Sequence, residues 1–110
     1  MNFTLHTGTK IPAIAFGTGT TYFRKNEAVT EGVINAYENG FRYIDTAIIY
    51  ETEEAVGVAI QKLINEKGIK REDIFVATKV NTDQYTFEKV SHTTFTWAIP
   101  DKLISIGPIR

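Results

Sequence analysis

Three ionisable side chains, Asp45, Tyr50 and Lys79, have the types and spacing of a proton-transfer site. Asp45 and Lys79 end two predicted strands, and Tyr50 lies in the loop that follows Asp45. Because the carboxyl ends of parallel strands meet on one face of an α/β fold, we expect the three side chains to converge there. A lysine cation favours the phenolate form of a neighbouring tyrosine, and a carboxylate keeps that lysine charged and oriented. A tyrosine in this setting can act as a general acid.

A purely structural explanation also fits these three residues. Asp45 could be a cap, Tyr50 a packed aromatic side chain and Lys79 a surface charge. Spacing alone does not decide between the two interpretations.

The N-terminal residues predict a β-hairpin and then a strand. Residues 3–12 alternate and turn at Gly8, where glycine supplies the positive φ of a tight turn. The apolar run 13–16 predicts a short buried strand, which a loop over 17–19 closes.

Helices and strands alternate after that loop. The predicted elements are a helix over 26–39, a strand over 41–47, a helix over 51–67 and a strand over 74–77. Asn26 is the expected N-cap of the first helix, and Gly40 and Gly68 stand where the two helices should end. The last strand is apolar throughout, which is typical of a strand buried on both faces. This order predicts parallel βαβ units.

The pattern ends after Val80. Residues 81–110 contain neither a clean helical stripe nor the strand expected after a helix, and prolines interrupt them. Residues 93–97 could make an edge strand. We therefore divide the chain into a patterned domain over 1–80 and a tail over 81–110 of unpredicted structure.

The composition excludes several classes of protein. Hydrophobic residues make up 43% and charged residues 23% of the 110 residues, as in ordinary globular domains. The net charge of −1 provides no long-range field for nucleic acid or anionic lipid. Cysteine is absent, and we find no signal-peptide pattern and no apolar stretch of membrane-spanning length. We expect a cytoplasmic protein.

The sequence around the three ionisable residues resembles the aldo-keto reductase family. The run 40–50, Gly-Phe-Arg-Tyr-Ile-Asp-Thr-Ala-Ile-Ile-Tyr, is similar to the family's Gly-aromatic-Arg strand, its Asp-Thr-Ala and its Tyr. Residues 74–79, Ile-Phe-Val-Ala-Thr-Lys, look like the strand that carries the family's lysine. Residues 11–18, Ile-Pro-Ala-Ile-Ala-Phe-Gly-Thr, look like its first barrel strand. The likeness runs in order from Leu5 to Val80.

The resemblance implies a fold and an activity. The fold is α/β, the N-terminal part of a (β/α)₈ TIM barrel, with a β-hairpin and about three βα units. The activity is NADP(H)-dependent reduction of aldehyde or ketone carbonyls to alcohols. Tyr50 would be the proton donor, Lys79 would lower the pKa of its phenol, and Asp45 would hold Lys79. Gly17, Thr18 and Asp45 would approach the nicotinamide end of the cofactor.

The implied partner is a small carbonyl compound, without a nucleic acid, a membrane or a metal ion. The oligomeric state is not indicated. Gly19 stands where many family members have Trp, so an aromatic wall of the expected substrate pocket is missing and the substrate class stays open. Thr52 stands where Asn is common. The family's catalytic His belongs to a later strand, and neither His6 nor His92 fits that place.

The length leaves two hypotheses open. A complete barrel of this type needs roughly 250 residues, so this sequence supplies three predicted barrel strands and an uncovered sheet edge. In the first hypothesis the chain is a truncated form of a carbonyl reductase and is inactive alone. In the second it is a non-catalytic interaction module that binds through its open sheet edge.

Overall fold

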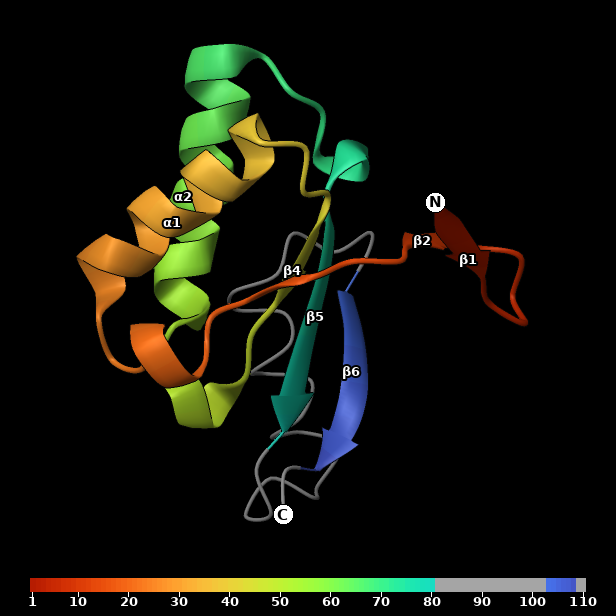
Figure 1. Cartoon of the computed structure of the whole chain (residues 1–110), viewed down its shortest axis with the longest axis horizontal. Helices are drawn as coiled ribbons and strands as arrows, with labels where there is room; N and C mark the ends of the chain where they lie inside the picture. Colours follow the sequence, from red (N-terminus) through yellow and green to blue (C-terminus); the bar gives the residue numbers. More distant parts are fainter. Residues whose placement is uncertain (81–102, 109–110) are drawn as a thin grey trace.

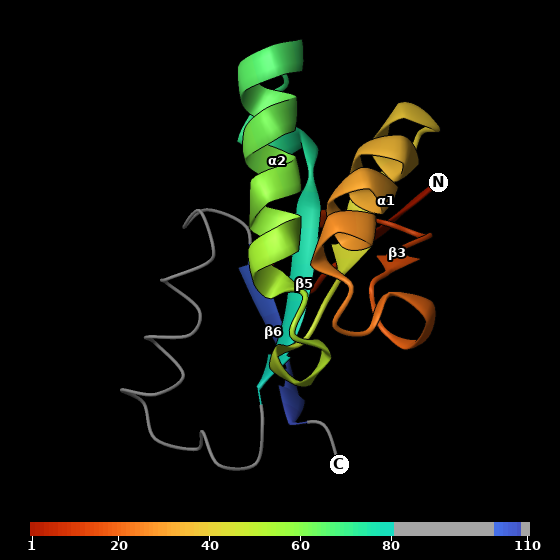
Figure 2. The same cartoon turned by 90° about the vertical axis from the view of Figure 1, so that its left-hand side faces the viewer.

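The computed structural model describes residues 1–80 and 103–108. Their main feature is a parallel sheet in the order β3 (Phe16–Gly17), β4 (Tyr43–Asp45), β5 (Phe75–Val80) and β6 (Leu103–Pro108). Helices α1 (Asn26–Glu38) and α2 (Glu53–Lys67) pack on each other and cover one face of this sheet (Figures 1 and 2). The antiparallel hairpin of β1 (Asn2–Thr4) and β2 (Lys10–Pro12) lies on the side away from the helices (Figure 1).

Both helices end where the sequence predicts. Gly40 lies just beyond α1 with φ +96°, and Gly68 follows α2 with φ +65°. Glycine reaches these left-handed conformations without the steric cost that a Cβ atom brings. The predicted cap of the first helix is wrong, because Asn26 is the first residue of α1 and no side chain caps that end.

The second helix starts later than predicted. A short 3₁₀ helix, η2 (Ile48–Tyr50), and the left-handed Glu51, at φ +53°, precede it. Two more 3₁₀ helices, η1 (Thr20–Tyr22) and η3 (Arg71–Asp73), lead into α1 and β5. The η2 turn places Tyr50 at the end of the sheet where the strands finish.

The core fills the space between the helices and the sheet. Its members come from the apolar stripes of both helices and from the strands that they cover; they are Val29, Val33, Ile44, Ala55, Val56, Ala59, Ile60, Leu63, Ile74 and Val76. Burial of a large aliphatic side chain of this kind contributes about 1.5–3 kcal/mol. The predicted double-sided burial of the last strand is confirmed, because Phe75, Val76 and Ala77 are all buried.

One strand prediction is wrong. The run 13–16 is not a buried strand, because β3 is only Phe16–Gly17 and Ile14 is 69% exposed. Residues 13–15 instead connect the hairpin to the sheet, a role that local apolar composition does not reveal.

The tail, whose structure the sequence left unpredicted, contributes one strand to the described part of the chain. This strand, β6, pairs with β5 and covers the edge of β5 that was expected to be open.

The β6 sequence hides its strand character because Gly107 and Pro108 stand at its end. Proline lacks a donor for the ladder and is tolerated at the end of a strand or at a sheet edge. Residues 93–97 and His92 lie outside the described residues. In the part of the chain that the structure describes, no helix is long and apolar enough to cross a membrane.

Candidate active site

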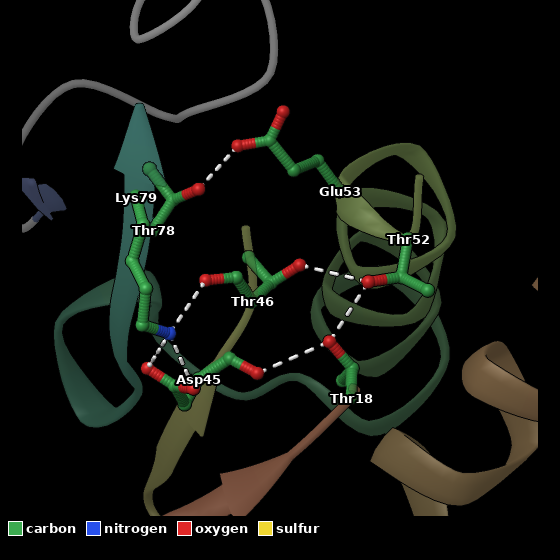
Figure 3. Close-up of polar contacts among 7 residues, drawn as sticks. All are labelled: Thr18, Asp45, Thr46, Thr52, Glu53, Thr78 and Lys79. Atoms are coloured by element: carbon green, nitrogen blue, oxygen red, sulfur yellow. Dashed lines mark hydrogen bonds and ion pairs between the residues drawn. The ribbon is translucent and has the colours of Figure 1, made fainter. Parts of the chain in front are cut away.

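An ion pair joins the ends of two neighbouring strands. The Lys79 ammonium donates to both carboxylate oxygens of Asp45, at 2.8 and 2.7 Å (Figure 3). The carbonyl oxygen of Thr46 accepts a further hydrogen bond from the same ammonium at 3.2 Å. Since an ammonium has three donors, these contacts fix its position fully. The side chains keep 21% (Lys79) and 25% (Asp45) of their surface exposed, so solutes can reach the pair.

Tyr50 completes the group that the sequence predicts. Its ring centroid lies 5.1 Å from the Lys79 Nζ atom, within the range of a cation–π contact. Within residues 1–80, the ammonium therefore meets the aromatic ring and gives its hydrogen bonds to Asp45 and Thr46. The three side chains converge, as expected, at the carboxyl end of the parallel strands.

The backbone of Gly19 packs against the same ring. A Cβ atom added at Gly19 would lie 3.2 Å from the ring carbon that carries the Tyr50 hydroxyl. Few real Cβ contacts are as tight, so a larger residue at this position requires the ring to shift by a few tenths of an ångström. The glycine that stands where many family members have Trp therefore allows a close approach of the Tyr50 ring.

Three buried threonine hydroxyls form a chain beneath the ion pair (Figure 3). The Thr18 hydroxyl donates to the Asp45 carbonyl oxygen at 3.1 Å and lies 2.8 Å from the Thr52 hydroxyl. The Thr52 hydroxyl also lies 2.9 Å from that of Thr46. Each hydroxyl has one proton, and Thr18 uses its own on Asp45. The direction follows: Thr46 donates to Thr52, and Thr52 donates to Thr18.

This chain ties the ends of β3 and β4 to the start of α2, next to Asp45. Thr18 follows β3, Thr46 follows β4, and Thr52 immediately precedes α2. All three side chains are almost fully buried, at 0%, 2% and 0% exposure respectively. When buried hydroxyls each donate to the next in the same direction, their hydrogen bonds polarise and strengthen one another.

Glu53 forms a second buried contact at the end of β5. Its carboxylate accepts a hydrogen bond from the Thr78 hydroxyl (Figure 3). Burial raises the pKa of the Glu53 carboxyl, while the hydrogen bond from Thr78 acts in the opposite direction. The neighbour of Lys79 is thereby anchored to the first turn of α2.

A second tyrosine lies close to the ion pair and has to be compared with Tyr50. Tyr43 packs against Phe75 with ring centroids 4.9 Å apart. Burial and then the Asp45 carboxylate raise the pKa of Tyr43, and the Lys79 cation opposes them. Tyr43 therefore holds its proton more tightly than a free phenol.

The residues predicted to approach a cofactor lie at the same end of the sheet. Gly17 pairs with Asp45 in the β3–β4 register, and a Cβ atom at Gly17 would meet no atom of the described residues within 4 Å. The Thr18 side chain, in contrast, is enclosed and its proton is used internally. Among the described residues, no group of three or more His, Cys, Asp or Glu side chains is arranged to hold a metal ion.

Sequence reasoning missed the polar support of the site, which consists of Thr46, Thr52, Glu53 and Thr78. A signal for part of it exists in the sequence. A threonine is adjacent to each of Gly17, Asp45 and Lys79, the residues that were predicted to bind or react. Repetition of threonine at strand ends that meet in space is the pattern that predicts such a chain.

Comparison with known proteins identifies the family. The model of the aldo/keto reductase family matches residues 13–97. The chain belongs to this family. It is 40% identical over 80 residues to aldose reductase C of Dictyostelium discoideum, a match that covers 72% of this chain and 24% of that reductase. It is 43% identical over 81 residues to glyoxal reductase of Bacillus subtilis, covering 73% of this chain and 27% of that reductase.

Solved aldo-keto reductases share the fold. The crystal structure of the Bombyx mori aldo-keto reductase in complex with NADP is 35% identical, with a TM-score of 0.69 over 82% of this chain and 30% of that one. The described residues thus form the N-terminal part of a (β/α)₈ barrel, and the sheet is not closed. The chain spans about a quarter of the length of the two curated relatives above.

Proposed function

We propose that this sequence carries the proton-donating part of an NADP(H)-dependent reductase that converts aldehyde or ketone carbonyls to alcohols. The observation that supports this proposal is the position of the Lys79 ammonium. It binds both carboxylate oxygens of Asp45 and lies 5.1 Å from the centroid of the Tyr50 ring. A phenol, a cation and an orienting carboxylate thus lie together at the carboxyl end of the sheet, where the ion pair is partly exposed.

The proposed chemistry assigns one task to each side chain. The Tyr50 hydroxyl gives its proton to the carbonyl oxygen of the substrate as negative charge develops there. The Lys79 cation stabilises the negative charge left on the phenol, and Asp45 keeps that cation charged and in place. When bound, NADPH supplies the hydride.

The open surface beside Gly17 fits the nicotinamide end of the cofactor. Among the described residues, no atom lies within 4 Å of a Cβ atom added at Gly17, and the side chain of Asp45 beside it is a quarter exposed. We infer that the Asp45 carboxylate and the backbone of Gly17 and Thr18 would hold this part of NADP(H). The buried hydroxyl of Thr18 has an indirect role, since it holds the Asp45 backbone.

The alternative function, a non-catalytic interaction module, is supported by the exposed edge of the sheet. Among the described residues, β4 is the only strand that pairs with β3. An unpaired strand edge presents free donors and acceptors to another chain. A stable chain that has a defined protein partner and no affinity for NADPH would favour this alternative.

The first experiment measures NADPH fluorescence with the purified chain, followed by NADPH consumption after addition of a simple aromatic aldehyde. Binding with aldehyde-dependent consumption is expected if the chain forms a complete site. A fusion separates the role of these residues from the completeness of the barrel. In the fusion, residues 1–80 replace the matching segment of the Bacillus subtilis glyoxal reductase, which is 43% identical over 81 residues. A folded fusion that binds NADPH but reduces no aldehyde would refute the proposal.

A further inference from the structure

Tyr50 lies on a segment with little rigidity of its own. The segment η2 is a single 3₁₀ turn, closed by hydrogen bonds from Tyr50 N–H to the Ala47 carbonyl at 3.1 Å and from Glu51 N–H to the Ile48 carbonyl at 3.0 Å. Short 3₁₀ turns have poorer hydrogen-bond geometry than α-helices and open easily. A proton donor on such a turn needs support from outside the turn.

Left-handed backbone conformations surround this turn. Among the described residues, Thr20, Arg24 and Glu51 have positive φ without being glycine, at +34°, +57° and +53°. Glu51 follows Tyr50 directly, and the Arg24 N–H donates to the Tyr50 carbonyl oxygen at 3.2 Å. Thr20 follows Gly19, whose backbone packs against the Tyr50 ring. Such conformations persist only where the surroundings enforce them, and they concentrate at functional sites.

One ion pair joins two of these three residues. The Arg24 Nη2 atom donates to Glu51 Oε1 at 3.0 Å, and Arg24 Nε lies 2.9 Å from Glu51 Oε2. This two-pronged geometry orients both partners more strictly than a single contact does. Arg24 therefore holds the tyrosine segment twice, through its backbone N–H and through its guanidinium.

We propose that Arg24 and Glu51 are positioning residues that clamp the η2 turn and thereby keep Tyr50 beside Lys79. The clamp joins the loop after β3 to the loop after β4, the two loops that carry Gly19 and Tyr50. The inference rests on the proposed role of Tyr50 as proton donor. Without the clamp, the turn opens more often and the Tyr50 ring leaves the Lys79 ammonium.

A second surface ion pair provides a matched control. Lys67 and Glu38 are paired at 44% and 43% exposure, against 62% and 58% for Arg24 and Glu51. They end α2 and α1, two regular helices that the buried core already fixes. Both pairs are exposed and contribute little to global stability. They differ in what they hold, because Arg24–Glu51 joins two irregular loops, whereas the core already fixes the helix ends that carry Lys67 and Glu38. Loss of the Lys67–Glu38 pair should therefore leave the tyrosine in place.

The test uses NMR spectroscopy of the whole chain, in which the signals of α1 and α2 report whether each variant is folded. The shift of the Lys79 ε-methylene protons reports the nearby Tyr50 ring, and amide exchange at Tyr50 and Glu51 reports opening of the turn. Arg24→Met and the near-isosteric Glu51→Gln are expected to change this shift. Both should accelerate the exchange about two- to fivefold, the factor that corresponds to an exposed ion pair.

The double variant Arg24→Glu with Glu51→Arg should restore both signals, and Lys67→Met should change neither. Unchanged signals in Arg24→Met and Glu51→Gln, or an equal response in Lys67→Met, would overturn the clamp. Kinetics of the active fusion separate the two proposals. The clamp predicts a lower kcat with an unchanged KM in Arg24→Met. If the turn opens more often in the NMR experiment but kcat does not change, the ion pair stabilises the turn but does not position Tyr50 for catalysis, and the positioning role is overturned.

Discussion

Replacement of Thr52 by Val is the change that tests the buried hydroxyl chain most sharply. The two side chains have nearly the same shape, but valine has no hydroxyl. Thr52 is fully buried and lies 2.8 Å from the Thr18 hydroxyl and 2.9 Å from the Thr46 hydroxyl. The substitution leaves a buried donor on Thr46 and a buried acceptor on Thr18 without partners. Each such group costs about 1–3 kcal/mol, so we expect a loss of about 2–6 kcal/mol in the free energy of unfolding.

Thr52→Ser is the matched control, because it keeps the hydroxyl and removes one buried methyl group. Its expected cost is about 1 kcal/mol. Urea unfolding followed by circular dichroism gives both values. The denaturant slope should stay constant between the variants if they differ only in stability. A valine variant as stable as the serine variant would refute the assignment of the hydroxyl chain as a major support of the site.

Three further predictions concern stability. Burial raises the pKa of Glu53, so its stabilising contribution is present below the unfolded pKa of about 4.3 and is lost as the pH rises through the raised folded value. Urea unfolding from acid to neutral pH should show that the free energy of unfolding of the Glu53→Gln variant depends less on pH in this range. An unchanged pH dependence would count against this role of Glu53. Gly68→Ala should cost about 1 kcal/mol by denaturation, because φ is +65° there, and a neutral effect would contradict this reasoning. Leu63 is 1% exposed, so Leu63→Ala should lower the free energy of unfolding by about 2–5 kcal/mol in the same assay. A cost below about 1 kcal/mol would show that neighbouring side chains fill the cavity left by the leucine.

The elements that sequence predicted best are those whose signals are local. The helical stripes of α1 and α2, the glycines that end them and the apolar run of β5 depend on neighbours in the chain. The meeting of Asp45 with Lys79 was also predictable, because both residues end parallel strands. Helical periodicity and the residue types at the strand ends were therefore sufficient to predict most of the order of helices and strands.

The features that the sequence predicted badly depend on residues that are distant in the chain. The exposure of Ile14 depends on how far β3 pairs with β4, and β6 depends on its neighbour β5. The threonine chain exists only because three separate segments meet. Likewise, the Lys79 ammonium lies near the ring of Tyr50 but donates its hydrogen bonds to Asp45 and Thr46. The sequence does not specify these partners, because they depend on the tertiary structure.

The most direct test of the central claim compares two tyrosines in the active fusion with glyoxal reductase. Tyr50→Phe removes the proposed proton donor, and Tyr43→Phe removes a hydroxyl near the same ion pair whose pKa is raised. The measurement is the rate of aldehyde-dependent NADPH consumption at saturating cofactor. We predict a loss of about 10²–10⁴-fold for Tyr50→Phe, the usual share of general acid catalysis, and little change for Tyr43→Phe. A Tyr50→Phe variant that keeps the full rate, or a Tyr43→Phe variant that loses it, would contradict the account.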